Sequence, residues 1–130
     1  LVIPERRLAR GQELGILGHG DGPRSIRVGE LMIGSLICAD GNNPQAWEPF
    51  RKEPPDIVFY QNNRGNVDEA RNPDFCREIN RPMVCTNRVG FSYYHFQLGG
   101  TRFIRRDGTI AVAANTEGKE QAIYARWQDL

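Results

Sequence analysis

The sequence predicts an α/β fold in which helices cover one face of a sheet with a parallel centre. Residues 31–38 are almost continuously apolar or small, which is typical of a strand buried on both faces. From residue 31 to residue 86 the expected order is strand, helix, strand, helix, strand, and this order favours parallel pairing. Two further strand-like runs, 98–104 and 109–113, are joined across Arg106-Asp107-Gly108, and this turn is typical of a hairpin.

Local signals set the bounds of each expected element. Residues 1–22 are rich in Arg and Gly and lack periodicity, so we expect an irregular segment there. Asn72 followed by Pro73 is typical of an N-cap and a first helical turn. In chain order we expect a short strand over Ser25–Val28, a strand over 31–38, a helix over 45–51, a strand over 57–60, a helix over 73–79, and strands over 82–86, 98–104, 109–113 and 121–127.

Length and composition are those of one soluble globular domain, or of part of a larger one. The chain has 130 residues, of which 39% are hydrophobic and 25% are charged, and these shares are ordinary for a globular protein. The formal net charge of +1 gives no overall attraction to nucleic acids or to anionic membranes. Arginines mixed with Tyr and Phe suggest a nucleic-acid module, but no RNA-binding or zinc-knuckle motif is present. We therefore expect neither nucleic acid nor a membrane among the partners.

Three cysteines, Cys38, Cys76 and Cys85, are too few and too widely spaced for a disulfide framework or a zinc site. We expect no metal and no cofactor. Free thiols fit a reducing compartment, so the expected location is cytoplasmic. No apolar run is long enough to span a bilayer, and no leader is visible. Because the chain begins at Leu1 without Met, we expect the native N-terminus to lie upstream.

Cys38 is the strongest candidate for a functional residue. It ends a buried strand, opens a tight polar turn over residues 39–44, and precedes a short helix. A strand end followed by a sharp turn into a helix is a favoured place for a nucleophile, because backbone N–H groups lie beside it. A helix N-terminus also favours the thiolate over the thiol. The alternative is a free cysteine of the core, since unpaired Cys is among the most buried residue types.

A family resemblance follows from the order of these motifs. Residues 34–44, with Trp47 close behind, resemble the nucleophile motif of the nitrilase superfamily of carbon–nitrogen hydrolases. The Asp-Gly-Asn after the cysteine is most similar to the aliphatic amidase and formamidase branch. Further matches follow in family order: the next core strand at 55–58, the strand ending in Asn-x-x-Gly at 84–90, the Gly-Gly strand at 98–101 and the Asp-Gly hairpin at 106–108.

The resemblance covers nearly the whole chain, from about Arg6 to Leu130. It implies a four-layer α-β-β-α sandwich of the nitrilase type, about twice this length. Residues 1–130 would then be the C-terminal portion of a carbon–nitrogen hydrolase domain, with the N-terminal half absent from this chain.

The resemblance also implies roles for particular residues. Cys38 matches the family's nucleophile, while the Glu that serves as general base lies in the family's first half. The family's oxyanion Lys has no Lys counterpart here, and Arg6 is nearest its place; Glu13 falls within a residue of the place of a second Glu. The alternatives are a solvated Arg and a surface carboxylate. The backbone N–H of Ala39 is the expected oxyanion donor.

Asn62 and Asn63 follow a strand that ends at the same sheet edge as Cys38, so they are candidates for a polar substrate pocket, or simply loop residues.

Two functions from different classes remain open at this point. The first is a cysteine-dependent amidohydrolase that cleaves a small amide or nitrile through a thioester and releases ammonia. The second is a catalytically incomplete or degenerate relative that acts as a binding or structural domain, which the missing Glu and Lys favour. In either case we expect a homo-oligomer, or pairing with an N-terminal half of the same fold.

Overall fold

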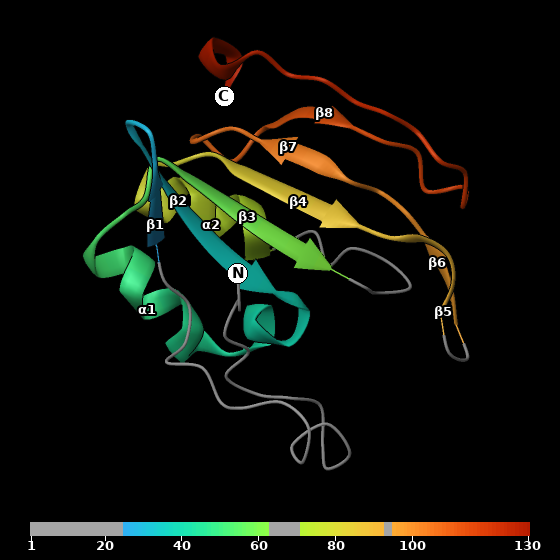
Figure 1. Ribbon diagram of the computed structural model, residues 1–130, viewed down its shortest axis with the longest axis horizontal. Coiled ribbons are helices and arrows are strands. Elements are labelled where there is room, and N and C mark those ends of the chain that lie inside the picture. The colour runs from blue at the N-terminus through green and yellow to red at the C-terminus, as the bar shows by residue number, and fades with distance from the viewer. Residues whose placement is uncertain (1–24, 63–70, 93–94) are drawn as a thin grey trace.

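The computed structural model describes residues 25–62, 71–92 and 95–130, and these residues form a mixed α/β fold (Figure 1). The main sheet has six strands in the order β1-β2-β3-β4-β7-β8, and β5 and β6 form a separate two-stranded sheet. The strands are β1 (Ser25–Val28), β2 (Leu31–Ile37), β3 (Ile57–Asn62), β4 (Met83–Asn87), β5 (Val89–Ser92), β6 (His95–Leu98), β7 (Arg102–Ile104) and β8 (Ile110–Ala113). The predicted fold class is confirmed.

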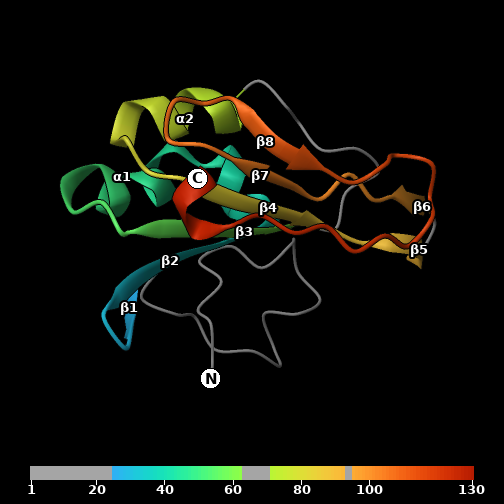
Figure 2. The ribbon, with the colours of Figure 1, turned by 90° about the horizontal axis from the view of Figure 1, so that it is seen from above.

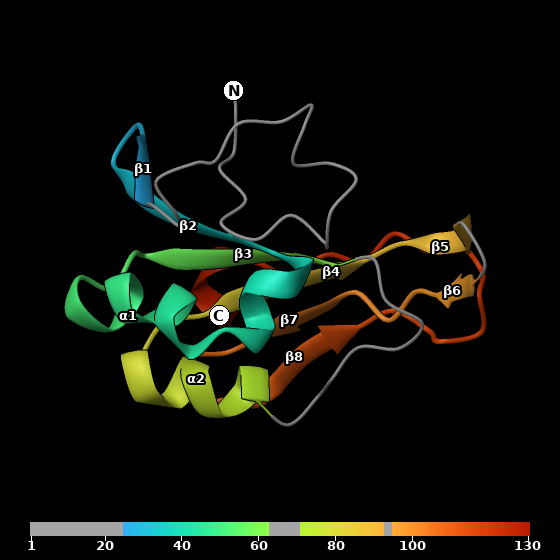
Figure 3. The same cartoon turned by 90° about the horizontal axis from the view of Figure 1, so that it is seen from below.

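The centre of the main sheet is parallel, as expected. β2 pairs with β3 and β3 with β4 in parallel register, while β1, β7 and β8 add antiparallel edges. The two connections between the parallel strands contain helices α1 (Pro44–Lys52) and α2 (Arg71–Ile79). Both helices lie on the same face of the sheet (Figure 3). The carboxyl ends of β2, β3 and β4 therefore meet at one edge.

The larger hydrophobic core lies between the sheet and the two helices. α1 contributes its buried residues Ala46, Trp47 and Phe50 to this core. The helix approaches β2 closely: a Cβ on Gly34 would lie 2.9 Å from Cε1 of Phe50 and 2.8 Å from Cγ of Pro55. A side chain at position 34 would therefore push α1 away from the sheet.

A second, smaller apolar cluster lies on the sheet face opposite the helices. Its buried members are Ile57, Val84 and Leu130, and the partly buried residues Ile33, Phe59, Phe103, Ala111 and Ala125 pack against them. Ala125 and Leu130 come from the C-terminal segment, which runs along the molecule beyond β8 and ends in the short 3-10 helix η2, Trp127–Asp129 (Figure 2). Much of this face consists of aliphatic and aromatic side chains that the described residues bury only in part.

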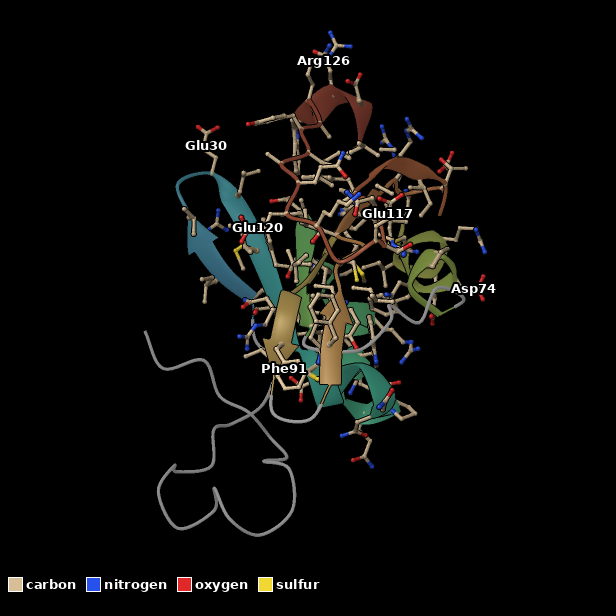
Figure 4. The ribbon with its side chains drawn as sticks, turned by 90° about the vertical axis from the view of Figure 1, so that its right-hand side faces the viewer. Glu30, Asp74, Phe91, Glu117, Glu120 and Arg126 are labelled. Atoms are coloured by element: carbon tan, nitrogen blue, oxygen red, sulfur yellow. The ribbon has the colours of Figure 1, made fainter. Side chains whose placement is uncertain are left out.

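The prediction of one continuous strand over 98–104 is wrong, because the strand is interrupted at residues 99–101. Gly99 and Gly100 have φ values of 84° and 86°, a left-handed conformation that breaks a strand. The part before the break is β6, which forms a hairpin with β5 that the sequence analysis missed. The part after it is β7, which joins the main sheet. The β5–β6 hairpin extends beyond the carboxyl edge of the sheet, and Phe91 lies on it (Figure 4).

Two other expectations are also wrong. Residues 121–127 do not form a strand; they lead into η2, and although Ala125 packs on the second apolar cluster, Tyr124 is 85% exposed. Asn72 is not an N-cap, because α2 begins at Arg71. Asn72 is instead buried, and its Nδ2 lies 3.5 Å from Sγ of Cys85.

Candidate functional site

Cys38 lies at the carboxyl end of β2 and is the first residue of the 3-10 helix η1, Cys38–Asn42. Its φ is +38°, in the left-handed region, and its side chain is partly exposed. Asn80 is the other non-glycine residue of the described chain with a positive φ, and Asn tolerates this region far better than Cys does. Non-glycine residues held there cost about 1–3 kcal/mol and cluster at functional sites. A sharp, strained strand-to-helix turn is a recurrent position for a nucleophile, as in the nucleophile elbow of other hydrolases.

A buried carboxylate stabilises this turn from within. Asp40 is 5% exposed, and its Oδ2 accepts a hydrogen bond of 3.1 Å from the backbone N–H of Ile37. Burial raises the pKa of Asp40, and the hydrogen bond from Ile37 only partly opposes this. The main chain continues at once into α1, because the side chain of Asn43 caps that helix through the N–H of Gln45 and Pro44 occupies its first turn.

A tyrosine from the neighbouring strand holds the backbone of Cys38. The hydroxyl of Tyr60 in β3 donates a 2.9 Å hydrogen bond to the carbonyl oxygen of Cys38. Gly41 makes this approach possible, because a Cβ there would lie 1.8 Å from Oη of Tyr60. Trp47 of α1 adds a 3.3 Å hydrogen bond from Nε1 to the carbonyl oxygen of Gly41. No sequence motif singles out Tyr60 as a site residue, because its contact with Cys38 depends on the register of β2 and β3.

Asn62 lies at the expected edge of the sheet. β2 and β3 pair Ile37 with Gln61, so Asn62 is one residue beyond the last paired position, as Cys38 is. Its Nδ2 donates to the carbonyl oxygen of Tyr60 at 3.3 Å and lies 3.4 Å from Sγ of Cys85. Its Oδ1 is buried and has no hydrogen-bond partner among the described residues. The side chain is thus partly fixed and carries one unused acceptor.

Of the remaining predicted site residues, the structure describes Ala39 and leaves three others outside its described ranges. Ala39 is the second residue of η1, so its backbone directly follows Cys38. Arg6, Glu13 and Asn63 lie outside the described residues, and their expected roles stay predictions.

The other two cysteines have a different environment. Cys76 of α2 and Cys85 of β4 are both completely buried in the helix-side core. Burial, with a smaller contribution from Cys85, raises the pKa of Cys76 to about 12. Since the thiolate is the reactive form, a buried thiol with such a pKa is inert near neutral pH.

We expect iodoacetamide to label Cys38 faster than Cys76 and Cys85 in the native protein. Accessibility alone favours Cys38, and the raised pKa of Cys76 adds to the difference. We estimate at least a tenfold rate difference, since the proportion of thiolate falls about tenfold for each unit by which the pKa exceeds the pH. Peptide mapping after brief alkylation measures the three rates. Equal labelling of all three thiols in folded protein would contradict this account of Cys38, and labelling in urea provides the control.

Sequence comparison gives no further assignment: no family model and no curated protein matches the chain. Solved structures do match its fold. A glutamine-dependent NAD+ synthetase from Acinetobacter baumannii has a TM-score of 0.74 and 17% identity, over 91% of this chain and 24% of that one. A carbon–nitrogen hydrolase from Helicobacter pylori has a TM-score of 0.66 and 20% identity, over 80% of this chain and 43% of that one.

An amidase from Nesterenkonia also matches, with a TM-score of 0.70 and 15% identity over 87% of this chain and 45% of that one. In that structure the acetamide moiety of fluoroacetamide is covalently added at the active-site cysteine. The fold of this chain is therefore that of the nitrilase-type carbon–nitrogen hydrolases. The chain spans less than half the length of these structures. In the described part of the chain, no helix is both long and apolar enough to cross a membrane.

Proposed function

We propose that this chain is the C-terminal portion of a cysteine-dependent amidohydrolase of the amidase type, with Cys38 as the nucleophile. The observation that carries the proposal is the left-handed conformation of Cys38 at the carboxyl end of a parallel strand. Cysteine has no intrinsic preference for this left-handed conformation, and a strained, partly exposed thiol is best explained by chemistry. The shared fold with amidases supports the same class of reaction.

The proposed reaction has two stages. In the first, the sulfur of Cys38 attacks the carbonyl carbon of a small amide, and the electron pair of the C=O bond moves to its oxygen. The backbone N–H of Ala39 stabilises the resulting oxyanion. The C–N bond then breaks, the nitrogen takes a proton and leaves as ammonia, and a thioester remains on Cys38. In the second stage water attacks the thioester carbon, which releases the carboxylic acid and returns the thiol.

Proton transfer needs a carboxylate within hydrogen-bond reach of the thiol and of the leaving nitrogen. By the family resemblance, this general base is a Glu from an N-terminal half of the fold. Glu13 is the candidate for a second carboxylate, and Arg6 is the candidate for the cation beside the oxyanion. An Arg retains the positive charge of the family's Lys, but its planar guanidinium has a different shape.

The proposed substrate is a short aliphatic amide. Asn62 lies at the same edge as Cys38 and has a buried amide oxygen without a partner among the described residues, which would accept a hydrogen bond from a substrate N–H. Asn63 is a second candidate for this polar side of the pocket. The test is ammonia release from acetamide, propionamide and butyramide by the complete protein, with a nitrile of each length for comparison.

A non-catalytic binding or structural domain is the second candidate, and one observation favours it: the sequence has Arg6 nearest the place where the family has its oxyanion Lys. The two proposals differ in the ammonia assay. Absence of ammonia release from every amide and nitrile, by complete protein that is folded, would leave the non-catalytic domain as the better account.

We expect the isolated chain to self-associate or to pair with an N-terminal half, as in a four-layer sandwich. The apolar sheet face opposite the helices, which includes Phe59 and Phe103, is only partly covered by described residues, and exposed apolar faces of this kind favour association. Sedimentation should give a mass above that of one chain. Phe59→Asp should shift the protein towards the monomer, whereas Phe91→Asp on the exposed hairpin should not. A compact monomer that unfolds cooperatively would contradict this expectation.

A further inference from the structure

We propose that Tyr60 is a positioning residue that directs the backbone N–H of Ala39 towards the oxyanion of the tetrahedral intermediate. The inference rests on the proposed function, because it assigns Tyr60 a role in the same site. It goes beyond that function by naming the group that holds the oxyanion donor in place.

The peptide bond between Cys38 and Ala39 carries both the carbonyl that Tyr60 contacts and the N–H of Ala39. In a trans peptide the C=O and N–H bonds point in opposite directions. The hydroxyl of Tyr60 donates to the Cys38 carbonyl oxygen at 2.9 Å, so this carbonyl points towards Tyr60. Tyr60 is 3% exposed and belongs to the core beneath the helices. The Ala39 N–H therefore points away from that core.

The position of Ala39 in its helix leaves this N–H without an acceptor inside the helix. The first N–H groups of a helix have no acceptor within the helix, and Ala39 is the second residue of η1. A donor that the helix does not use, next to the nucleophile and directed away from the core, is what an oxyanion hole requires.

The neighbours of Tyr60 fix its hydroxyl from two sides. Gly41 packs so closely that a Cβ there would lie 1.8 Å from Oη of Tyr60. Trp47 meets the Tyr60 ring edge-on, with the ring centroids 5.8 Å apart, and holds the Gly41 carbonyl through Nε1. Rotation of the Cys38–Ala39 peptide would break a hydrogen bond in this partly buried setting.

The left-handed φ of Cys38 explains why such a restraint is needed. At +38° the backbone is strained, and rotation of the following peptide is one way to relieve the strain. Without the Tyr60 hydroxyl we expect this peptide to take other orientations, in which the Ala39 N–H no longer faces the substrate oxygen. The stability of the charged intermediate depends on this donor more strongly than the binding of the neutral substrate does.

Two reactions of the same thiol separate positioning from a merely structural role. Butyraldehyde adds to Cys38: an S–C bond forms, the electron pair of the C=O bond moves to oxygen, and that oxygen, held by the Ala39 N–H, takes the thiol proton. Iodoacetamide alkylates the sulfur and expels iodide, and no tetrahedral oxyanion forms. The first reaction therefore depends on the oxyanion donor, whereas the second reports only on the thiol.

In the complete protein we expect Tyr60→Phe to weaken inhibition by butyraldehyde about tenfold or more. We expect it to lower kcat for butyramide by roughly ten- to a hundredfold with little change in KM, since removal of an oxyanion donor costs about 10²–10³ in kcat. The rate of alkylation of Cys38 should stay within about twofold of wild type. Tyr124→Phe, at a tyrosine that is 85% exposed, is the matched control and should leave all three unchanged.

Gly41→Ala gives a second, independent variant, because its new methyl group would displace the Tyr60 hydroxyl. It should reproduce the weaker aldehyde inhibition and the lower kcat. Wild-type aldehyde affinity and kcat in Tyr60→Phe would overturn the inference while leaving the proposed function intact. A parallel fall in the alkylation rate would also overturn it, since Tyr60 would then act on the fold. If wild-type protein neither bound butyraldehyde nor released ammonia, the proposed function would fail, and this inference with it.

Discussion

Cys38→Ser should lower ammonia release from a short aliphatic amide by at least about a thousandfold in the complete protein. Serine fits the same turn and retains the backbone contacts that hold it, among them the hydrogen bond from Tyr60 to the carbonyl of residue 38. What changes is the nucleophile, since a hydroxyl has a far higher pKa than a thiol. Steady-state kinetics with an ammonia-coupled readout measures the loss.

A matched control removes a different thiol. Cys76→Ala deletes a buried sulfur that we place outside the chemistry, so it should reduce stability more than turnover. Circular dichroism of both variants shows whether the fold persists. Full turnover by folded Cys38→Ser would falsify the assignment of Cys38 as nucleophile. Complete loss of ammonia release in folded Cys76→Ala would show that the reaction requires Cys76, which contradicts its place outside the site.

Much of the sheet could be predicted because its signals are local. The apolar run of β2, the prolines before β3 and the Asp-Gly turn between β7 and β8 each act within a few residues of the chain. Together they fix the order of strands and helices, and parallel pairing follows from that order. The strand end at Cys38 was predictable for the same reason.

The features that the sequence did not reveal depend on contacts between distant segments. Tyr60 and Cys38 are 22 residues apart, and only the register of β2 against β3 places them together. The Gly99-Gly100 break was visible as composition, but its left-handed conformation and the separate β5–β6 hairpin depend on the surrounding structure. Residues 121–127 are rich in apolar and aromatic residues like a strand, yet they are not part of either sheet.

The predicted roles of Arg6, Glu13 and Asn63 rest on position in the sequence alone, and no contact in the described part of the chain bears on them. Ala39 and Asn62 differ in this respect, because the structure describes both: Ala39 follows Cys38 in η1, and Asn62 lies one residue beyond the last pair of β2 and β3. Their roles stay proposals, but proposals with a geometry that mutation can test.

Phe50→Ala should destabilise the protein by about 3–5 kcal/mol, the usual cost of emptying a buried phenylalanine site. Phe50 of α1 is completely buried, and its ring packs against Gly34 of β2. Because Gly34 has no side chain, the cavity left by Phe50→Ala can close only if α1 moves. A domain is typically stable by only about 5–15 kcal/mol, so a large part of the total would be lost. Urea unfolding followed by circular dichroism measures the change.

Phe91→Ala is the control for the same substitution at the surface. Phe91 is 67% exposed on the β5–β6 hairpin, and its loss should change the free energy of unfolding by no more than about 0.5 kcal/mol. Similar midpoints for the two variants would show that α1 is not packed on β2 as described. That result would also undermine the site, because α1 carries Trp47, whose indole holds the Gly41 carbonyl beneath the turn of Cys38. A shift of α1 after loss of Phe50 should displace Trp47 and the turn of Cys38. Ammonia release should therefore fall in the fraction of Phe50→Ala that stays folded.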